Sequence, residues 1–129
     1  MFTVEQIRQE HSKIKSGSDF PKYIQDLIQL GISSYETYVS DGHTHYQGIN
    51  GFNCTSDARY GTLDVTVKIN KYQFQNDLKA HQQGKTDYPT FCKDCAKSGI
   101  EKWVVCMDNM TCTYFDKTGN KILVEQIPN

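Results

Sequence analysis

Apolar side chains recur at helical spacing in two stretches at the start of the sequence. The first stripe predicts a helix over about residues 3–15 and consists of Val4, Ile7, His11 and Ile14. A second helix is expected to begin at Ser18-Asp19-Phe20-Pro21, because Ser or Asp can cap a helix and proline is tolerated in its first turn. This helix should end near Gly31, and its apolar side comprises Tyr23, Ile24, Leu27 and Ile28.

The pattern then changes to one that is typical of strands. Residues 32–39 are rich in β-branched and aromatic side chains, which favours a strand. The dipeptide Asp41-Gly42 predicts a two-residue hairpin turn, followed by a return strand that contains Thr44 and Tyr46. A further short strand is expected near Phe52.

Residues 62–69 alternate between apolar and polar side chains and predict a strand with one wet face. Two more helices should follow, one from about Tyr72 to Gly84 and one from Thr86-Asp87-Tyr88-Pro89 to Gly99. Three strands complete the expected elements, over residues 102–107, 111–115 and 122–127.

An internal repeat appears when the chain is aligned with itself so that Ser18 meets Thr86. The matches fall on helix caps, helix ends and aromatic strand positions, which are the places that define a supersecondary unit. They pair Ser18-Asp19-Phe20-Pro21 with Thr86-Asp87-Tyr88-Pro89, Gly31-Ile32 with Gly99-Ile100, Tyr35 with Trp103, and Tyr46 with Tyr114. We therefore expect an α+β domain over residues 1–129, built from two diverged helix-helix-strand-strand repeats (about 3–48 and 72–127). Its sheet should be antiparallel or mixed, with the helices mainly on one face.

Composition narrows the functional classes. The 14 Lys and Arg residues balance 15 Asp and Glu residues, so the net charge gives no reason to expect a nucleic acid or an anionic membrane as partner. No apolar run is long enough to span a bilayer, and the first residues do not resemble a secretory signal. The five cysteines, an odd number, then favour reduced thiols in the cytoplasm. A homo-oligomer is compatible with these observations.

Cys92 and Cys95 form a C-x-x-C motif, which can signal a redox site or half of a zinc site. The expected helix places Cys92 in its interior rather than at its N-terminus, and no second pair has the spacing of a zinc knuckle. In the repeat, the two cysteines align with Ile24 and Leu27, which lie on an apolar helix face. We therefore expect both thiols to be reduced and to pack in the core.

Histidines give the remaining chemical candidates. His43 and His45 should share one face of the return strand, where they could act as metal ligands with Glu36 nearby. With a turn at Asp41-Gly42, His43 would oppose Ser40 and His45 would oppose Tyr38. Both should be partly exposed, because Thr44 and Tyr46 occupy the opposite face. His11 and His81, which correspond across the repeat, form a second candidate pair.

Several stretches resemble a family of small bacterial proteins often labelled "phage envelope protein", a family whose activity is unknown. The resemblance covers nearly the whole chain and rests on Phe20-Pro21, Leu30-Gly31-Ile32, His81-Gln82-Gln83-Gly84-Lys85, Trp103 and Thr113-Tyr114-Phe115. Because the family has no agreed activity, the resemblance does not assign a catalytic residue, and the cofactor stays unknown.

Three hypotheses on function follow from the sequence. The first is a small non-enzymatic binding or interaction module, because no catalytic, phosphate-binding or dinucleotide-binding motif is present. The second is a metal-dependent or general-base enzyme that uses His43 and His45, or His11 and His81. The third, suggested by the label of the family, is a phage structural protein. The ligand, the cofactor and the oligomeric state stay open.

Overall fold

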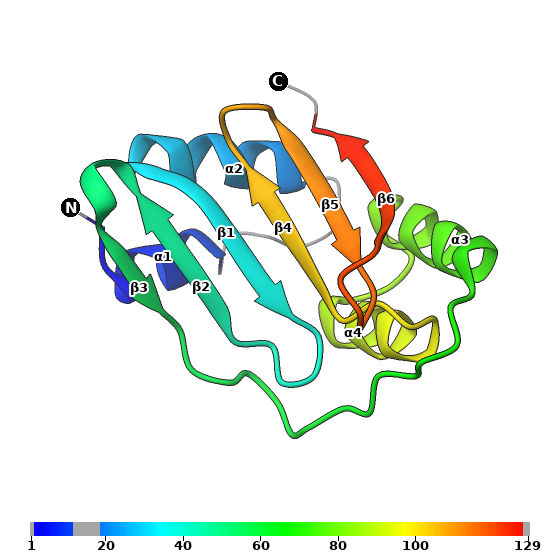
Figure 1. Cartoon of the computed structure of the whole chain (residues 1–129). Helices are drawn as coiled ribbons and strands as arrows, with labels where there is room; N and C mark the ends of the chain where they lie inside the picture. Colours follow the sequence, from blue (N-terminus) through cyan, green and yellow to red (C-terminus); the bar gives the residue numbers. More distant parts are fainter. Residues whose placement is uncertain (1, 12–18, 128–129) are drawn as a thin grey trace.

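The computed structural model describes residues 2–11 and 19–127. Along these residues the chain forms two α-helices, three strands, two further α-helices and three further strands (Figure 1). The helices are α1 (Val4–His11), α2 (Phe20–Gln29), α3 (Lys71–Gln82) and α4 (Tyr88–Lys97). The strands are β1 (Ile32–Tyr38), β2 (Thr44–Gly48), β3 (Asn53–Thr55), β4 (Lys102–Cys106), β5 (Thr111–Phe115) and β6 (Lys121–Gln126), with a short 3-10 turn η2 (Ile49–Gly51) before β3.

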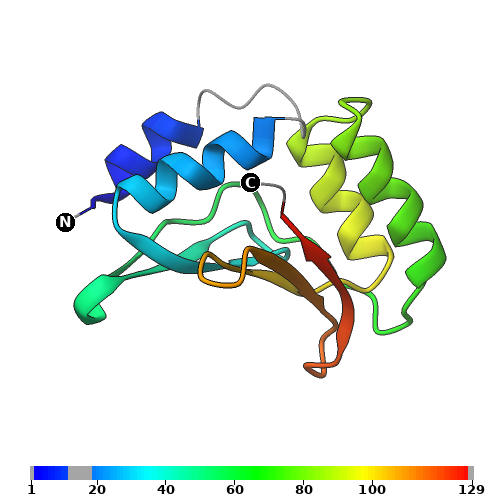
Figure 2. The ribbon, with the colours of Figure 1, turned by 90° about the horizontal axis from the view of Figure 1, so that it is seen from above.

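The six strands form one sheet in the order β3-β2-β1-β4-β5-β6. Each neighbouring pair is antiparallel, and β1 meets β4 at the centre. Figure 2 shows that the helices lie on one side of this sheet, with α1 and α2 over one part and α3 and α4 over the other. The expected α+β class, with helices on one face, is therefore confirmed, and the sheet is antiparallel rather than mixed.

Strand alternation divides the sheet into a helix-facing side and an open face. On β1, Tyr35 and Thr37 are buried whereas Glu36 and Tyr38 are partly exposed. The same alternation holds on β4 and β5, and it places these buried side chains under the helices: Trp103, Val105, Cys112 and Tyr114. The opposite face of the sheet carries no described helix, so its side chains can meet a ligand.

The two halves of the chain run through the same order of elements. α2 and α4 begin and end at positions that the repeat aligns, Phe20 with Tyr88 and Gln29 with Lys97, and each leads into an antiparallel hairpin. A third strand follows each hairpin, β3 in the first half and β6 in the second, which adds a strand to the expected unit. The origin of this arrangement by duplication stays a proposal.

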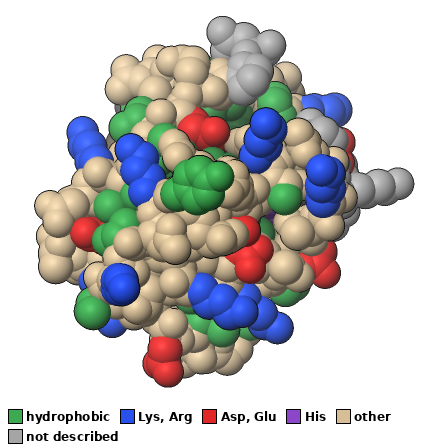
Figure 3. All heavy atoms as spheres, turned by 90° about the vertical axis from the view of Figure 1, so that its right-hand side faces the viewer, with side chains coloured by type: hydrophobic (Ala, Val, Ile, Leu, Met, Phe, Trp, Pro, Cys, Tyr) green, Lys and Arg blue, Asp and Glu red, His purple; other side chains and the backbone are tan. Residues whose placement is uncertain are grey.

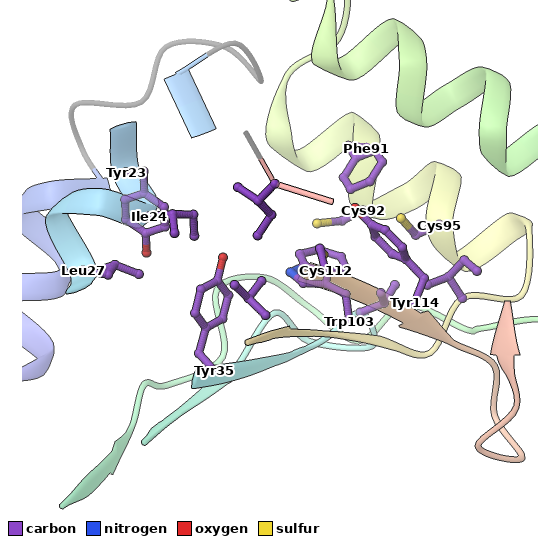
Figure 4. Packing of buried hydrophobic residues seen from close by; sticks show 14 of the residues in the cluster. Tyr23, Ile24, Leu27, Tyr35, Phe91, Cys92, Cys95, Trp103, Cys112 and Tyr114 are labelled. Atoms are coloured by element: carbon purple, nitrogen blue, oxygen red, sulfur yellow. The ribbon is translucent and has the colours of Figure 1, made fainter. Parts of the chain in front are cut away.

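The core between the helices and the sheet includes both members of the C-x-x-C motif. Cys92 and Cys95 are fully buried on α4, above the layer where Trp103 and Tyr114 pack (Figure 4). Both thiols are free, and burial raises the pKa of each. The expectation that both cysteines pack in the core is confirmed, and their raised pKa values make them poor nucleophiles at neutral pH.

Residues 62–69 do not form the expected strand. The segment has no strand partner and instead follows α4, where the Thr66 amide donates to the Ala96 carbonyl (3.0 Å). Val65 is buried, but Val67 is 81% exposed. The alternating pattern is misleading because a strand also needs a partner strand beside it, and this segment hydrogen-bonds to the end of α4 instead.

Two smaller expectations also need correction. The helical pattern predicts a buried Ile28, but this side chain is exposed, because α2 turns only one narrow side toward the sheet. The first helix is expected over residues 3–15, and α1 spans Val4–His11; the rest of that prediction lies outside the described residues.

On the side of the molecule that Figure 3 shows, no large patch of the described residues consists only of acidic or only of basic side chains. Basic and acidic side chains are interspersed there, on the side of the molecule that lies at the right of Figure 1. Within the described part of the chain, no helix is both long and apolar enough to cross a membrane.

Candidate functional site

The turn between β1 and β2 is longer than the sequence suggests. Tyr38 pairs with His43 through its amide, which donates to the His43 carbonyl (3.0 Å), so residues 39–42 form the connection. His45 therefore lies opposite Glu36, and His43 lies opposite Tyr38. The predicted partners, Tyr38 for His45 and Ser40 for His43, are wrong by two residues, because the turn has four residues instead of two.

His43 is held by two neighbours. The Asp41 carboxylate accepts a hydrogen bond from His43 Nδ1 (2.6 Å) and another from the His43 amide (2.9 Å). The His43 ring also stacks on Tyr38, with the centroids 4.5 Å apart and the planes 5° from parallel. These hydrogen bonds, the one from the His43 amide first, lower the pKa of Asp41, so this carboxylate is ionised at neutral pH and fixes the orientation of the imidazole.

Next to this stack, Glu36 and Lys102 form an ion pair on neighbouring strands. The Lys102 ammonium also lies over two rings, 5.6 Å from the Tyr38 centroid and 5.4 Å from the Phe115 centroid. The hydrogen bond to Glu36 raises the pKa of Lys102, and burial followed by the charge of Glu36 raises the pKa of the Tyr38 hydroxyl. Both groups therefore keep their protons at neutral pH.

A shallow hollow of about 140 Å³ lies on the open face beside this ion pair. Its lining comes from three neighbouring strands and consists of Ser34, Tyr35, Glu36, His45, Gln47 and Val104. His45 lies directly opposite Glu36 on the neighbouring strand, but the Glu36 carboxylate pairs with Lys102. Among the described residues, no side-chain hydrogen bond or ring contact involves His45. Its imidazole is therefore available to a ligand in the hollow.

We call Glu36, Tyr38, Asp41, His43, His45, Lys102 and Phe115 the open-face cluster. His43 and His45 are both partly exposed on the face away from the helices, as predicted. The sequence also placed Glu36 and Tyr38 near them. It did not identify Asp41, which we expected only as a turn residue, or Lys102 and Phe115, which join the cluster through the pairing of β1 with β4.

The turn that carries Asp41 is fixed by residues 56–70, which connect β3 to α3 and pass beside it (Figure 1). The Tyr60 hydroxyl donates to the Val39 carbonyl (2.6 Å), and the amides of Arg59 and Leu63 donate to the carbonyls of Asp41 (2.8 Å) and Ser40 (2.6 Å). The cluster is thus preorganised by a segment that lies outside the sheet.

The second histidine pair is not assembled into a site by the described residues. His81 stacks on Phe91 (centroids 4.4 Å apart), and its Nδ1 lies 3.2 Å from the Thr86 carbonyl. Burial lowers the pKa of His81. This is the environment of a structural histidine at the α3–α4 turn. The side chain of His11 lies outside what the structure describes.

Metal binding by His43 and His45 also stays a prediction. Within residues 2–11 and 19–127, no group of three His, Cys, Asp or Glu side chains gathers in a way that could hold a metal ion. A metal at this position would have the two imidazoles as its protein ligands. Asp41 would orient the His43 ring through the hydrogen bond at Nδ1.

Comparison with protein families places this chain in a known group. The model of the family described as "Protein of unknown function (DUF1398)" matches residues 8–126. The chain belongs to the DUF1398 family. A search of curated proteins gives no match. Membership of DUF1398 agrees with the resemblance drawn from the sequence, in so far as the family has no known activity; the phage envelope label gains no support from it.

Proposed function

We propose that this DUF1398 protein is a small non-enzymatic binding module whose ligand lies on the open face of the sheet, over the open-face cluster. The observation that supports this most strongly is the uncovered face itself, where Glu36, His45 and Gln47 line a hollow of about 140 Å³. Each contact described above can serve to bind a ligand, so the arrangement does not require a catalysed reaction.

The size of the hollow favours a small ligand. Its volume of about 140 Å³ lies below the roughly 300–1,000 Å³ of pockets for drug-sized ligands. A small polar molecule that contacts Glu36 and His45 fits this volume.

NMR spectroscopy tests the proposal. We expect at least one member of a panel of small amines, carboxylic acids and sugars to shift backbone amide signals in residues 34–36, 45–47 and 102–104. His45→Ala should weaken that binding, whereas Thr113→Ala should not. Thr113 is the matched control, because the repeat aligns it with His45 and it lies on the same face of the sheet. Shifts that map to the helices, or no shift with any compound, would contradict the proposal.

A general-base role for His43 is the second candidate, favoured by the 2.6 Å contact between its Nδ1 and Asp41. An imidazole that donates from Nδ1 presents the lone pair of Nε2, which can accept a proton or attack an acyl group. Hydrolysis of p-nitrophenyl acetate tests this role. His43→Ala and Asp41→Asn should both lower the rate, and Thr111→Ala, at the matching position of the second hairpin, should leave it unchanged.

The remaining hypotheses have separate tests. Calorimetry with zinc would show specific binding that His43→Ala or His45→Ala abolishes if these residues hold a metal. Genes for capsid or tail proteins beside the gene of this protein would support a phage structural role, and metabolic neighbours would oppose it. A cytoplasmic location in a bacterium stays a prediction that fractionation of cells would test.

A further inference from the structure

Three side chains form a row across the centre of the open face. Tyr38 on β1 is the register partner of Lys102 on β4, which in turn is the register partner of Phe115 on β5. The ammonium of Lys102 therefore stands between two aromatic rings, with 5.6 Å to one centroid and 5.4 Å to the other. The Glu36 carboxylate completes the surroundings of this cation.

This arrangement is the one that proteins use to bind alkylammonium groups. The faces of aromatic rings carry negative potential, so two rings and one carboxylate attract a single cation from several sides. We refer to Tyr38, Phe115 and Glu36 as the cage. In the structure, the cage already holds the ammonium group of the protein's own Lys102.

The walls of the cage are better fixed than its occupant. Tyr38 is braced on its outer side by the stacked His43 ring, which Asp41 holds in turn. Lys102 has a flexible four-carbon stem and a side chain that is 28% exposed. Its ammonium can leave for solvent without a change in the sheet, whereas the rings cannot easily move.

We infer that the cage binds the alkylammonium group of a small ligand, and that this ligand displaces the Lys102 ammonium. The inference rests on the proposed function and names the ligand class for that same face. The rest of the ligand would occupy the hollow beside Glu36, where His45 and Gln47 offer hydrogen bonds. Lys102 then acts as a built-in competitor that weakens the binding of simple amines.

The test compares n-butylammonium with neutral n-butanol, which has the same chain but no charge. We expect Lys102→Met to bind n-butylammonium about tenfold or more tightly than the unaltered protein, because it removes a competitor of millimolar or higher effective concentration. Adding Glu36→Gln to Lys102→Met should reverse this gain, and n-butanol should bind neither protein. Lys117→Met, in the exposed turn between β5 and β6, is the control for the loss of one positive charge.

A second measurement uses the unaltered protein and so does not depend on how the variant folds. The two rings should shift the Lys102 Hε signals upfield, and these signals should return toward ordinary lysine values as n-butylammonium is added. Equal affinities for Lys102→Met and the unaltered protein, or Hε signals that do not move at saturation, would overturn the inference. If panel compounds other than amines still shift residues 34–36 and 45–47, the proposed function stands and only the ligand class is wrong.

Discussion

The two hairpin turns of the molecule share a backbone shape but differ in what surrounds them. Gly42 in the first turn and Met110 in the second occupy matching positions of the repeat, and both have a positive φ, of 78° and 52°. The first turn is held by residues 56–70, whereas the second is held by the segment after β6, where the Ile127 amide donates to the Met110 carbonyl (2.7 Å). The open-face cluster includes Asp41 from the first turn and His43 directly after it, and no residue of the second turn belongs to it.

The two turns also differ in the space beside their positive-φ residue. A Cβ atom on Gly42 would lie 2.7 Å from the Tyr60 ring, so this position requires glycine both for its φ and for the close approach of the ring. The second turn accommodates the Met110 side chain at the same place. Position 42 of the first turn is thus restricted to glycine. The Tyr60 segment that packs against it supports Asp41 and His43.

The largest effect should come from glycine replacement in the first turn. We expect Gly42→Ala to destabilise the protein by about 2–4 kcal/mol, since it combines backbone strain with a clash against Tyr60. Met110→Gly should change stability by less than about 1 kcal/mol, because relief of strain offsets the lost side-chain contacts. Urea unfolding measures both. Equal losses for the two variants would remove the contrast between the turns.

Replacement of a cysteine by serine should give a smaller difference in stability between a buried and a partly exposed position of the second half. Cys92→Ser should destabilise by about 1–3 kcal/mol, because it buries a hydroxyl group where the thiol is fully enclosed. Cys106→Ser, on the open face, should cost less than about 0.5 kcal/mol. A thiol reagent in native buffer should accordingly modify Cys106 much faster than Cys92. Fast modification of Cys92 would show that the packing between α4 and the sheet opens readily.

The second half should also carry a dependence on pH through His81. Burial holds the pKa of this imidazole below 6.5 in the folded state, so the unfolded chain takes up the proton first as the pH falls. The contribution of His81 to stability should therefore be constant above about pH 6.5 and decrease as the pH falls from there toward the lower folded-state pKa. Urea unfolding between about pH 7.5 and 5 should show a weaker decrease for His81→Gln than for the unaltered protein. If stability fell equally with pH in His81→Gln and in the unaltered protein, groups other than His81 would cause the pH dependence.

A small effect should also come from the partly exposed ion pair of Glu36 and Lys102. Lys102→Met should change the free energy of unfolding by less than about 1 kcal/mol, because a pair that is partly open to solvent adds little to stability. A loss of several kcal/mol would mean that the open-face cluster holds the two halves together, and would weaken its assignment as a binding site. Thermal unfolding measured at equal ionic strength gives this comparison.

Local patterns in the sequence are sufficient to predict most helices and strands and four of the seven residues of the open-face cluster. Helical periodicity and caps locate α2 and α4, and alternation places His43 and His45 on the side opposite Thr44. The strand predicted over residues 62–69 is wrong because a strand depends on a partner strand beside it, and no local signal reports whether one is there.

The missing members of the cluster share the same cause. Lys102 and Phe115 join Glu36 and Tyr38 only because β1 pairs with β4, a contact between segments far apart along the chain. Asp41 is recognisable as a turn residue, yet its hydrogen bonds to His43 depend on a four-residue turn that the dipeptide Asp41-Gly42 does not predict.

The central pairing of β1 with β4 also bears on how the chain folds. Every other strand pair joins neighbours along the chain, so each half can close its ladders over short loops. The ladder that joins the halves, in contrast, brings Glu36 beside Val104 across a long sequence separation. Contacts of such high contact order form slowly, because the entropy of closing a long loop is lost before they stabilise the chain. We therefore expect substitutions along β1 and β4 to govern the refolding rate, and substitutions at the two sheet edges to affect mainly the unfolding rate.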